Sequence, residues 1–279
     1  ILRRTDLDAS ANLQFSSSET SNPPILRFQS DSDSYLISYD LQGVSASGYN
    51  SQEFDGSNAV TLRDGSSLTP TGGGEFVEWN TQSDGGGTSY SSSASYSTKA
   101  TLNLYAIYRL EASPTLSYSD ATFTDGGTAN PTSADDSHDG TKTFSATPAS
   151  VCTVDSSTGV VSIQSAGDCT VTASYALSSN YLATSVSDTF SVAKANQATL
   201  NWDLSDTDVD YGSTLSLAVT GGSGTGAVSY TASGDGCSVS GSTLIGLDAS
   251  ESCSVTATKA SDDSYNAAST SSQSITINK

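Results

Sequence analysis

The chain has 279 residues, with 30 acidic and 10 Lys or Arg side chains, and its formal net charge is −20 at pH 7. This charge repels phosphate backbones and anionic lipid surfaces, so nucleic acid is not an expected partner. No run approaches the ~20 apolar residues of a membrane-spanning helix, so membrane insertion is not expected either. The acidity itself is typical of solubility and resistance to aggregation.

The length and the residue usage also bear on domain number and processing. A chain of this length alone predicts roughly two domains. The sequence contains no methionine, and no charged, then apolar, then small-residue signal opens it. A chain without an initiator Met predicts a processed mature protein or an excised fragment.

The first predicted element is an extended strand near the N-terminus. Its backbone groups need a partner, yet the Ser-rich segment 16–24 that follows provides no tight turn and no adjacent partner strand. The strand either folds back onto its own first domain or is donated to a neighbouring molecule, which would produce head-to-tail polymers. Apolar residues alternate with polar ones, as in a strand with one buried face, at Leu7, Ala9, Ala11, Leu13 and Phe15.

Residues 35–110 predict a small domain of short strands separated by Asp-Gly and Gly-Gly turns. Its motifs are Tyr-Asp-Leu at 39–41, Phe-x-x-Trp-Asn-Thr at 76–81 and Leu-Tyr-Ala-Ile-Tyr at 104–108. In this order they resemble the internalin-type B-repeat of bacterial surface proteins. The resemblance implies a β-grasp domain.

Two positions of this segment depart from that repeat. Gly74 replaces an aromatic residue, and Glu78 replaces a glycine. A ligand surface on that hairpin is therefore not carried over from the family. Trp79 is an attractive sugar-stacking residue, but we expect it in the hydrophobic core.

The rest of the chain contains two related segments. Cys152 and Cys169 flank a predicted hairpin, and Cys237 and Cys253 flank another. Cys169 and Cys253 are 84 positions apart, as are Tyr181 and Tyr265. This period is too long for a solenoid unit and fits tandem domains, each with its own core.

The four cysteines predict two structural disulfides. Three pairings exist on paper, but the repetition selects Cys152–Cys169 and Cys237–Cys253, because each then closes inside its own domain. The spacings lack the C-x-x-C character of a zinc or redox site. Disulfides in turn predict an oxidising compartment.

Strands recur in both segments at about 8–12-residue spacing, which is typical of a β-sandwich. The runs 153–161 and 166–173 resemble the bacterial Ig-like repeats of adhesins and surface stalks. The resemblance covers both segments and implies a location outside the cell.

No catalytic constellation is predicted. His138 is the only histidine, and it stands in a polar loop with no evident nucleophile or orienting group. The glycine runs 72–74, 85–87 and 221–226 lack the Lys-Ser/Thr of a phosphate loop and are interpreted as turns.

Calcium is the only cofactor for which the sequence offers candidate ligands, and we expect no calcium site. Gly212 comes one place too late for an EF-type loop, and Leu217 stands where the bidentate Glu belongs. Strand alternation explains the nearest acidic run better, with Val209 and Tyr211 pointing inward. The acidic residues that we considered are Asp203, Asp206, Asp208 and Asp210 in one group and Asp135, Asp136 and Asp139 in another.

The sequence thus predicts a mainly β fold, in which a small β-grasp domain is followed by two tandem Ig-like β-sandwiches. The expected boundaries are 1–34 for an N-terminal extension with the extended strand, then 35–110, 111–194 and 195–279 for the domains.

The expected function is that of a non-enzymatic extracellular structural protein, a stalk or filament subunit of a bacterial surface adhesin or fibre. Its partners would be copies of itself, head to tail, or neighbouring surface domains. The alternative is a surface binding module that recognises a glycan or a host protein through exposed Tyr or loop Asp residues.

Overall fold

The computed structural model describes residues 12–14, 27–29, 34–134 and 137–279, and it confirms the mainly β fold. Every regular element in these ranges is a β-strand, so none of them forms a helix that could cross a membrane. The chain divides into two compact units. The first is Ile1–Glu111 with Ser178–Leu182, and the second is Ala112–Leu177 with Ala183–Lys279.

The N-terminal strand has a partner in its own chain. Strand β1 (Asn12–Gln14) pairs antiparallel with β2 (Arg27–Gln29), and Leu13 stands opposite Phe28 in the register. The expectation of no nearby partner strand was wrong for these residues, because the partner follows the Ser-rich segment instead of adjoining a tight turn. The other predicted positions, Leu7, Ala9, Ala11 and Phe15, lie outside the described residues.

A five-stranded sheet forms the centre of the first unit, in the order β4-β3-β9-β6-β7. Strands β3 and β9 pair in parallel, and the other neighbours pair antiparallel. Two shorter strands, β5 and β8, pair separately. The bounds are β3 (Tyr35–Asp40), β4 (Gln52–Phe54), β5 (Val60–Thr61), β6 (Gly74–Asn80), β7 (Ser89–Tyr90), β8 (Ser95–Tyr96) and β9 (Leu102–Leu110).

Trp79 lies at the centre of the core of this unit. Its side chain is fully buried, packs edge-on against Phe76 and Tyr39, and donates a hydrogen bond from Nε1 to the Arg63 carbonyl at 2.7 Å. This confirms the predicted core position. The β-grasp class stays a prediction, because residues 34–110 contain no helix to pack on the sheet.

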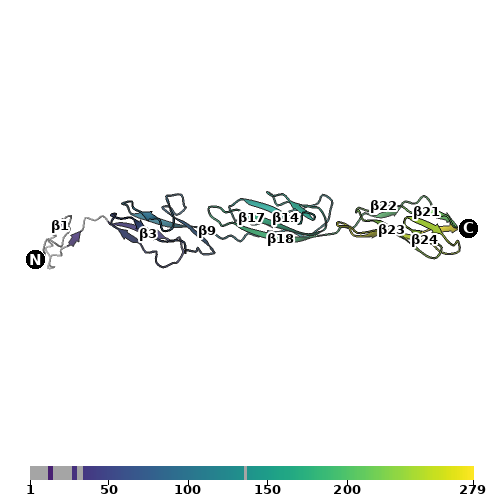
Figure 1. Cartoon of the computed structure of the whole chain (residues 1–279), viewed down its shortest axis with the longest axis horizontal. Helices are drawn as coiled ribbons and strands as arrows, with labels where there is room; N and C mark the ends of the chain where they lie inside the picture. The colour runs from purple at the N-terminus through teal and green to yellow at the C-terminus, as the bar shows by residue number, and fades with distance from the viewer. Residues whose placement is uncertain (1–11, 15–26, 30–33, 135–136) are drawn as a thin grey trace. The chain divides into compact units, whose positions relative to one another are not determined.

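The second unit contains two hydrophobic cores, each inside a β-sandwich. Figure 1 labels β14, β17 and β18 of the first sandwich and β21 to β24 of the second. In the first Ig-like domain, which comprises β10 to β18, a sheet of order β11-β18-β17-β14 faces a sheet of order β12-β16-β15. Its strands are β10 (Leu116–Ser117), β11 (Ala121–Thr122), β12 (Thr128–Ala129), β13 (Ser133–Ala134), β14 (Lys142–Thr147), β15 (Cys152–Val154), β16 (Val161–Ile163), β17 (Gly167–Tyr175) and β18 (Thr184–Ala193).

The second Ig-like domain, β19 to β29, repeats these pairings. Its sheet β21-β25-β24 corresponds to β12-β16-β15, and the parallel pair β20-β29 corresponds to β11-β18. Its strands are β19 (Leu200–Trp202), β20 (Asp208–Asp210), β21 (Thr214–Ser216), β22 (Val219–Gly221), β23 (Val228–Ser233), β24 (Cys237–Ser240), β25 (Thr243–Gly246), β26 (Ser254–Lys259), β27 (Ala268–Ser269), β28 (Gln273–Ser274) and β29 (Thr276–Asn278).

Each sandwich is closed by one buried disulfide. The bonds join Cys152 to Cys169 and Cys237 to Cys253, which is the predicted pairing. Three of the cysteines lie on the buried face of a strand, and Cys253 is buried just before β26; along β17, for example, Val171 is buried with Cys169. The disulfides therefore link the two layers of each core.

We expect the double substitution Cys152→Ala and Cys169→Ala to destabilise the first Ig-like domain by about 3 kcal/mol, because it releases a closed loop in the unfolded chain. Denaturant unfolding of the full chain would measure the change. Reduction of the unsubstituted chain should produce a similar loss in the same domain. An unchanged unfolding midpoint would show that the sandwich does not depend on its disulfide.

Candidate functional site

The most elaborate polar site in the second unit is the junction between its two Ig-like domains. Ala195 lies in the connector between the two Ig-like domains, residues 194–197. It donates a backbone hydrogen bond to the Ser264 carbonyl (3.0 Å) and accepts one from Asn266 N–H (2.8 Å). Ala195 and Tyr265 thus form an isolated parallel β-bridge. The connector pairs with the loop 262–266 as a short added strand, which fixes its backbone.

Two further hydrogen bonds tie this loop to the first Ig-like domain. Lys194 Nζ donates to the Asp262 carbonyl at 2.5 Å, and Ala166 N–H donates to the Asp263 carbonyl at 3.2 Å. Ala166 lies in the turn between β16 and β17, so the loop is held from two separate elements.

Asp262 shapes the loop from within. Its Oδ1 accepts backbone hydrogen bonds from Ser264 (2.9 Å) and Tyr265 (2.8 Å), and its Oδ2 accepts one from Thr225 (2.5 Å). Short Asp side chains often form turns in this way. The hydrogen bonds, from Ser264 first and then Thr225, lower the pKa of Asp262 to about 2. The carboxylate stays ionised and is committed to the backbone of the loop.

An aromatic pair covers the end of the first hydrophobic core. Phe123 is only 7% exposed and meets Tyr265 edge to face, with ring centroids 5.4 Å apart. Tyr265 and Ala195 both pack against the core cluster of the first Ig-like domain. A residue of the second domain therefore covers part of the first hydrophobic core.

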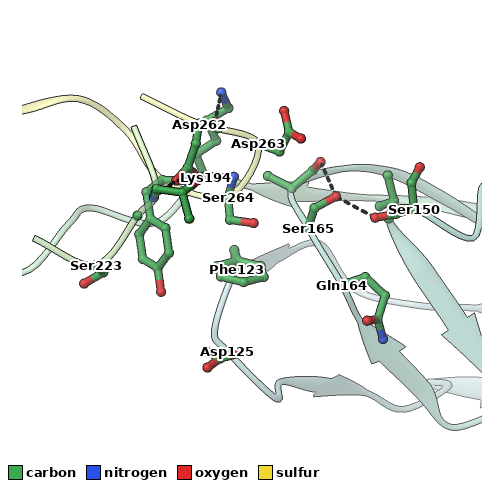
Figure 2. Close-up of a pocket in the computed structure, with 15 residues that line it drawn as sticks. Phe123, Asp125, Ser150, Gln164, Ser165, Lys194, Ser223, Asp262, Asp263 and Ser264 are labelled. Atoms are coloured by element: carbon green, nitrogen blue, oxygen red, sulfur yellow. Dashed lines mark hydrogen bonds between the residues drawn. The ribbon is translucent and has the colours of Figure 1, made fainter. Parts of the chain in front are cut away.

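An open cleft of about 890 Å³ runs along this junction. Figure 2 shows the segment with Asp262 and Ser264 above Phe123. Ser165, on the opposite wall, donates a hydrogen bond to the Ser150 carbonyl at 2.9 Å. Two charged side chains that line the cleft, Lys194 and Asp262, form hydrogen bonds to backbone atoms of the loop. The arrangement therefore connects the two domains.

The same loop geometry occurs in the first unit. Leu110 forms a parallel bridge with Tyr181, donates to the Asn180 carbonyl (2.8 Å) and accepts from Leu182 N–H (2.9 Å). Ser178 Oγ takes the role of the Asp262 carboxylate by accepting the Tyr181 N–H at 2.9 Å. The 84-residue repeat thus includes the loop that receives an incoming chain segment.

His138 lies in a loop, as predicted, but it is buried there. Its side chain is only 5% exposed and its ring centroid lies 5.2 Å from that of Tyr175. Nδ1 accepts a hydrogen bond from Gly140 N–H at 2.9 Å. The tight turn folds the imidazole back onto the sheet, which no local sequence signal indicated.

The acidic groups considered for calcium do not assemble in the part of the chain that the structure describes. No three His, Cys, Asp or Glu side chains there come together as a metal site. The carboxylate of Asp206 instead accepts the backbone N–H groups of Thr207 and Asp208. Asp135 and Asp136 lie outside the described residues.

Strand alternation around these residues was predicted correctly for one side chain and wrongly for another. Val209 is buried, but Tyr211 is 67% exposed. Strand β20 ends at Asp210, and the chain turns at Gly212 with a φ of 74°. The period-2 rule therefore no longer applies at Tyr211.

Residues 35–107 match the family model of the Listeria-Bacteroides repeat domain, Flg_new. The match covers most of the segment interpreted as an internalin-type B-repeat and a minority of the whole chain. No curated protein matches the sequence.

Similar solved structures include domains EC1-4 of Drosophila N-cadherin, at 13% identity and a TM-score of 0.30, covering 99% of this chain and 86% of that one. Human protocadherin-24 EC1-2 has 14% identity and a TM-score of 0.28, with 60% and 99% covered. Domains 1-6 of the surface layer protein SbsC have 15% identity and a TM-score of 0.24, with 98% and 36% covered.

Repeated β domains, the matched repeat and two disulfides together indicate an extracellular surface repeat protein. Within it, the segment similar to the Listeria-Bacteroides repeat domain is residues 35–107.

We expect Tyr265→Ala to destabilise the first Ig-like domain by about 2 kcal/mol, because it uncovers Phe123 and removes a partly buried ring. Hydrogen exchange of the segment 121–129 should accelerate. Tyr211→Ala is the matched control, since this exposed ring should change stability by less than about 0.5 kcal/mol. Equal effects of the two substitutions would show that the junction contributes nothing to the first core.

The lowered pKa of Asp262 gives a pH prediction. A carboxylate with a lowered folded-state pKa stabilises the fold above its ordinary value of 3.8 and loses that contribution as the pH falls toward about 2. The amide proton shifts of Ser264 and Tyr265 should therefore titrate with a midpoint near 2. In Asp262→Asn this titration should disappear, whereas in Asp263→Asn it should persist.

Proposed function

We propose that the chain is a non-enzymatic structural protein on the bacterial cell surface, in which its Ig-like domains form part of a stalk or filament. The observation that carries this proposal is the junction at Ala195, where backbone pairing and the Phe123–Tyr265 contact join two disulfide-closed sandwiches. Polar side chains at this junction hold the backbone in place.

The strand plan supports a load-bearing role. In each Ig-like domain an early strand pairs in parallel with the last strand, β11 with β18 and β20 with β29. When a domain is pulled from its two ends, parallel terminal strands slide past each other, so their hydrogen bonds are loaded together. Peeling them apart one at a time would require less force.

The local surroundings of the reactive side chains support a role without catalysis. His138 packs against Tyr175 and accepts a backbone hydrogen bond. The carboxylate of Asp155 accepts hydrogen bonds from Ser157 and Thr158, which lower its pKa well below the usual range. Both groups stabilise turns, and we assign them no substrate.

The stalk form is favoured over polymerisation by strand donation. The described residues of the N-terminal strand, Asn12–Gln14, pair with Arg27–Gln29 of the same chain. Donation to a neighbouring molecule would have to open this pairing. Association with neighbouring surface domains does not require such a step.

Pulling single molecules of the full chain tests the mechanical role. Each Ig-like domain should unfold as a separate event, with the residues between its cysteines shielded from extension. Reduction should lengthen the extension of the first domain by about 50 Å, because its cysteines are 17 residues apart and their Cα atoms are already separated by 6.0 Å. The variant Cys152→Ala with Cys169→Ala should show this length without reductant. Gradual extension without separate events would contradict the proposal.

The location is tested on intact producing cells. Protease added outside should release fragments of the chain, and antibodies should label it by electron microscopy. Deletion of residues 112–279 should shorten the labelled surface structure. Protection of the chain until the cells are lysed would contradict the surface assignment.

A further inference from the structure

The second Ig-like domain has a face at the ends of β20 and β29 that carries an exposed aromatic side chain. Tyr211 is 67% exposed and Leu247 is 47% exposed. A cleft of about 450 Å³ is lined there by Tyr211, Asp248, Ala249, Ser250 and Lys279. A large exposed aromatic side chain beside a cleft is a candidate contact residue.

Strand register shows which residues of the first Ig-like domain correspond to this face. Phe123 follows β11 and donates its N–H to the Ala193 carbonyl at the end of β18. Tyr211 follows β20 and donates its N–H to the Asn278 carbonyl at the end of β29. Tyr211 therefore occupies the position of Phe123, and the next residues, Lys194 and Lys279, correspond as well.

The second wall of the face corresponds in the same way. Cys152 pairs with Ile163 in the first domain, and Cys237 pairs with Gly246 in the second. Three residues beyond these partners stand Ala166 and Ala249. Ala166 is the residue whose N–H binds the Asp263 carbonyl at the junction.

The two faces differ in what covers them. In the first Ig-like domain the loop 262–266 lies over the face, and Phe123 is 7% exposed. At the equivalent place in the second domain, Tyr211 is 67% exposed. The second face thus carries residues equivalent to those that bind the loop at the junction.

We propose that this face docks a further Ig-like domain through a loop of the type Asp/Ser-x-x-Tyr, equivalent to residues 262–265. The tyrosine of that loop packs on Tyr211, and the carbonyl of the second loop residue, equivalent to Asp263, accepts a hydrogen bond from Ala249 N–H. The ammonium group of Lys279 binds the first carbonyl of the loop, as Lys194 does. This proposal deepens the structural role proposed above and rests on it.

A further Ig-like domain is favoured over an intact second copy of this chain, because both loops of this type in the chain are already paired. Within one chain, the loop Ser178–Leu182 already pairs with Leu110, and the loop 262–266 already pairs with Ala195. An intact copy would have to release one of these pairings to dock. A domain that still has this loop uncovered needs no such release.

The test is an extended chain, in which a second copy of residues 195–279 follows directly after Lys279. This design reproduces the connector sequence Lys-Ala-Asn-Gln of residues 194–197. The appended copy carries Tyr211→Phe, so that every Tyr211 peptide comes from the original domain. Nitration of tyrosines, read by peptide mass spectrometry, then reports the exposure of that side chain. We expect Tyr211 of the original domain to lose its reactivity in the extended chain and approach that of buried Tyr118.

The matched control is the same extended chain with Tyr265→Ala and Asp262→Ala in the appended copy alone. Its Tyr211 should react as in the chain without extension, and oxidation of the appended cysteines to a disulfide verifies that the copy has folded. Equal reactivity of Tyr211 with both appended copies, each folded, would overturn the proposal. Failure to find the protein on cells would overturn the proposed function and leave this result unaffected.

Discussion

The structure of the second unit depends on one contact, the place where Ala195 pairs with Tyr265 and Tyr265 covers Phe123. A sandwich of this size has limited apolar surface to bury. Its open end is therefore costly to leave in water. Since a loop of the second domain covers the end of the first core, the two domains share part of their hydrophobic stabilisation.

Backbone atoms make most of this contact, which explains why its sequence signature is small. The loop pairs with Leu110 in one case and with Ala195 in the other. The side chain of Ser178 or of Asp262 stabilises the turn. Only the tyrosine is common to both. The polar side chains of the loop fix its backbone conformation, so the role of this surface is structural.

The sequence predicted the features that depend on repetition and alternation. Both disulfides, the core position of Trp79 and the inward position of Val209 follow from local patterns. Tyr211 was placed wrongly because its exposure depends on where a strand ends. The burial of His138 was not predicted, because it depends on how a turn folds back. The pairing of β1 with β2 was missed, since a long polar segment separates the two strands. The junction itself could have been found only from the repeated tyrosine.

Each disulfide closes within a single sandwich, and no covalent bond other than the backbone crosses the junction at Ala195. Gene duplication or loss of one such module would leave every remaining cysteine with its partner. Evolution could therefore change the length of this protein in steps of about one repeat, without compensating substitutions elsewhere. Selection for greater or smaller reach from the cell would then act on module number and leave the sequence of each module largely unchanged.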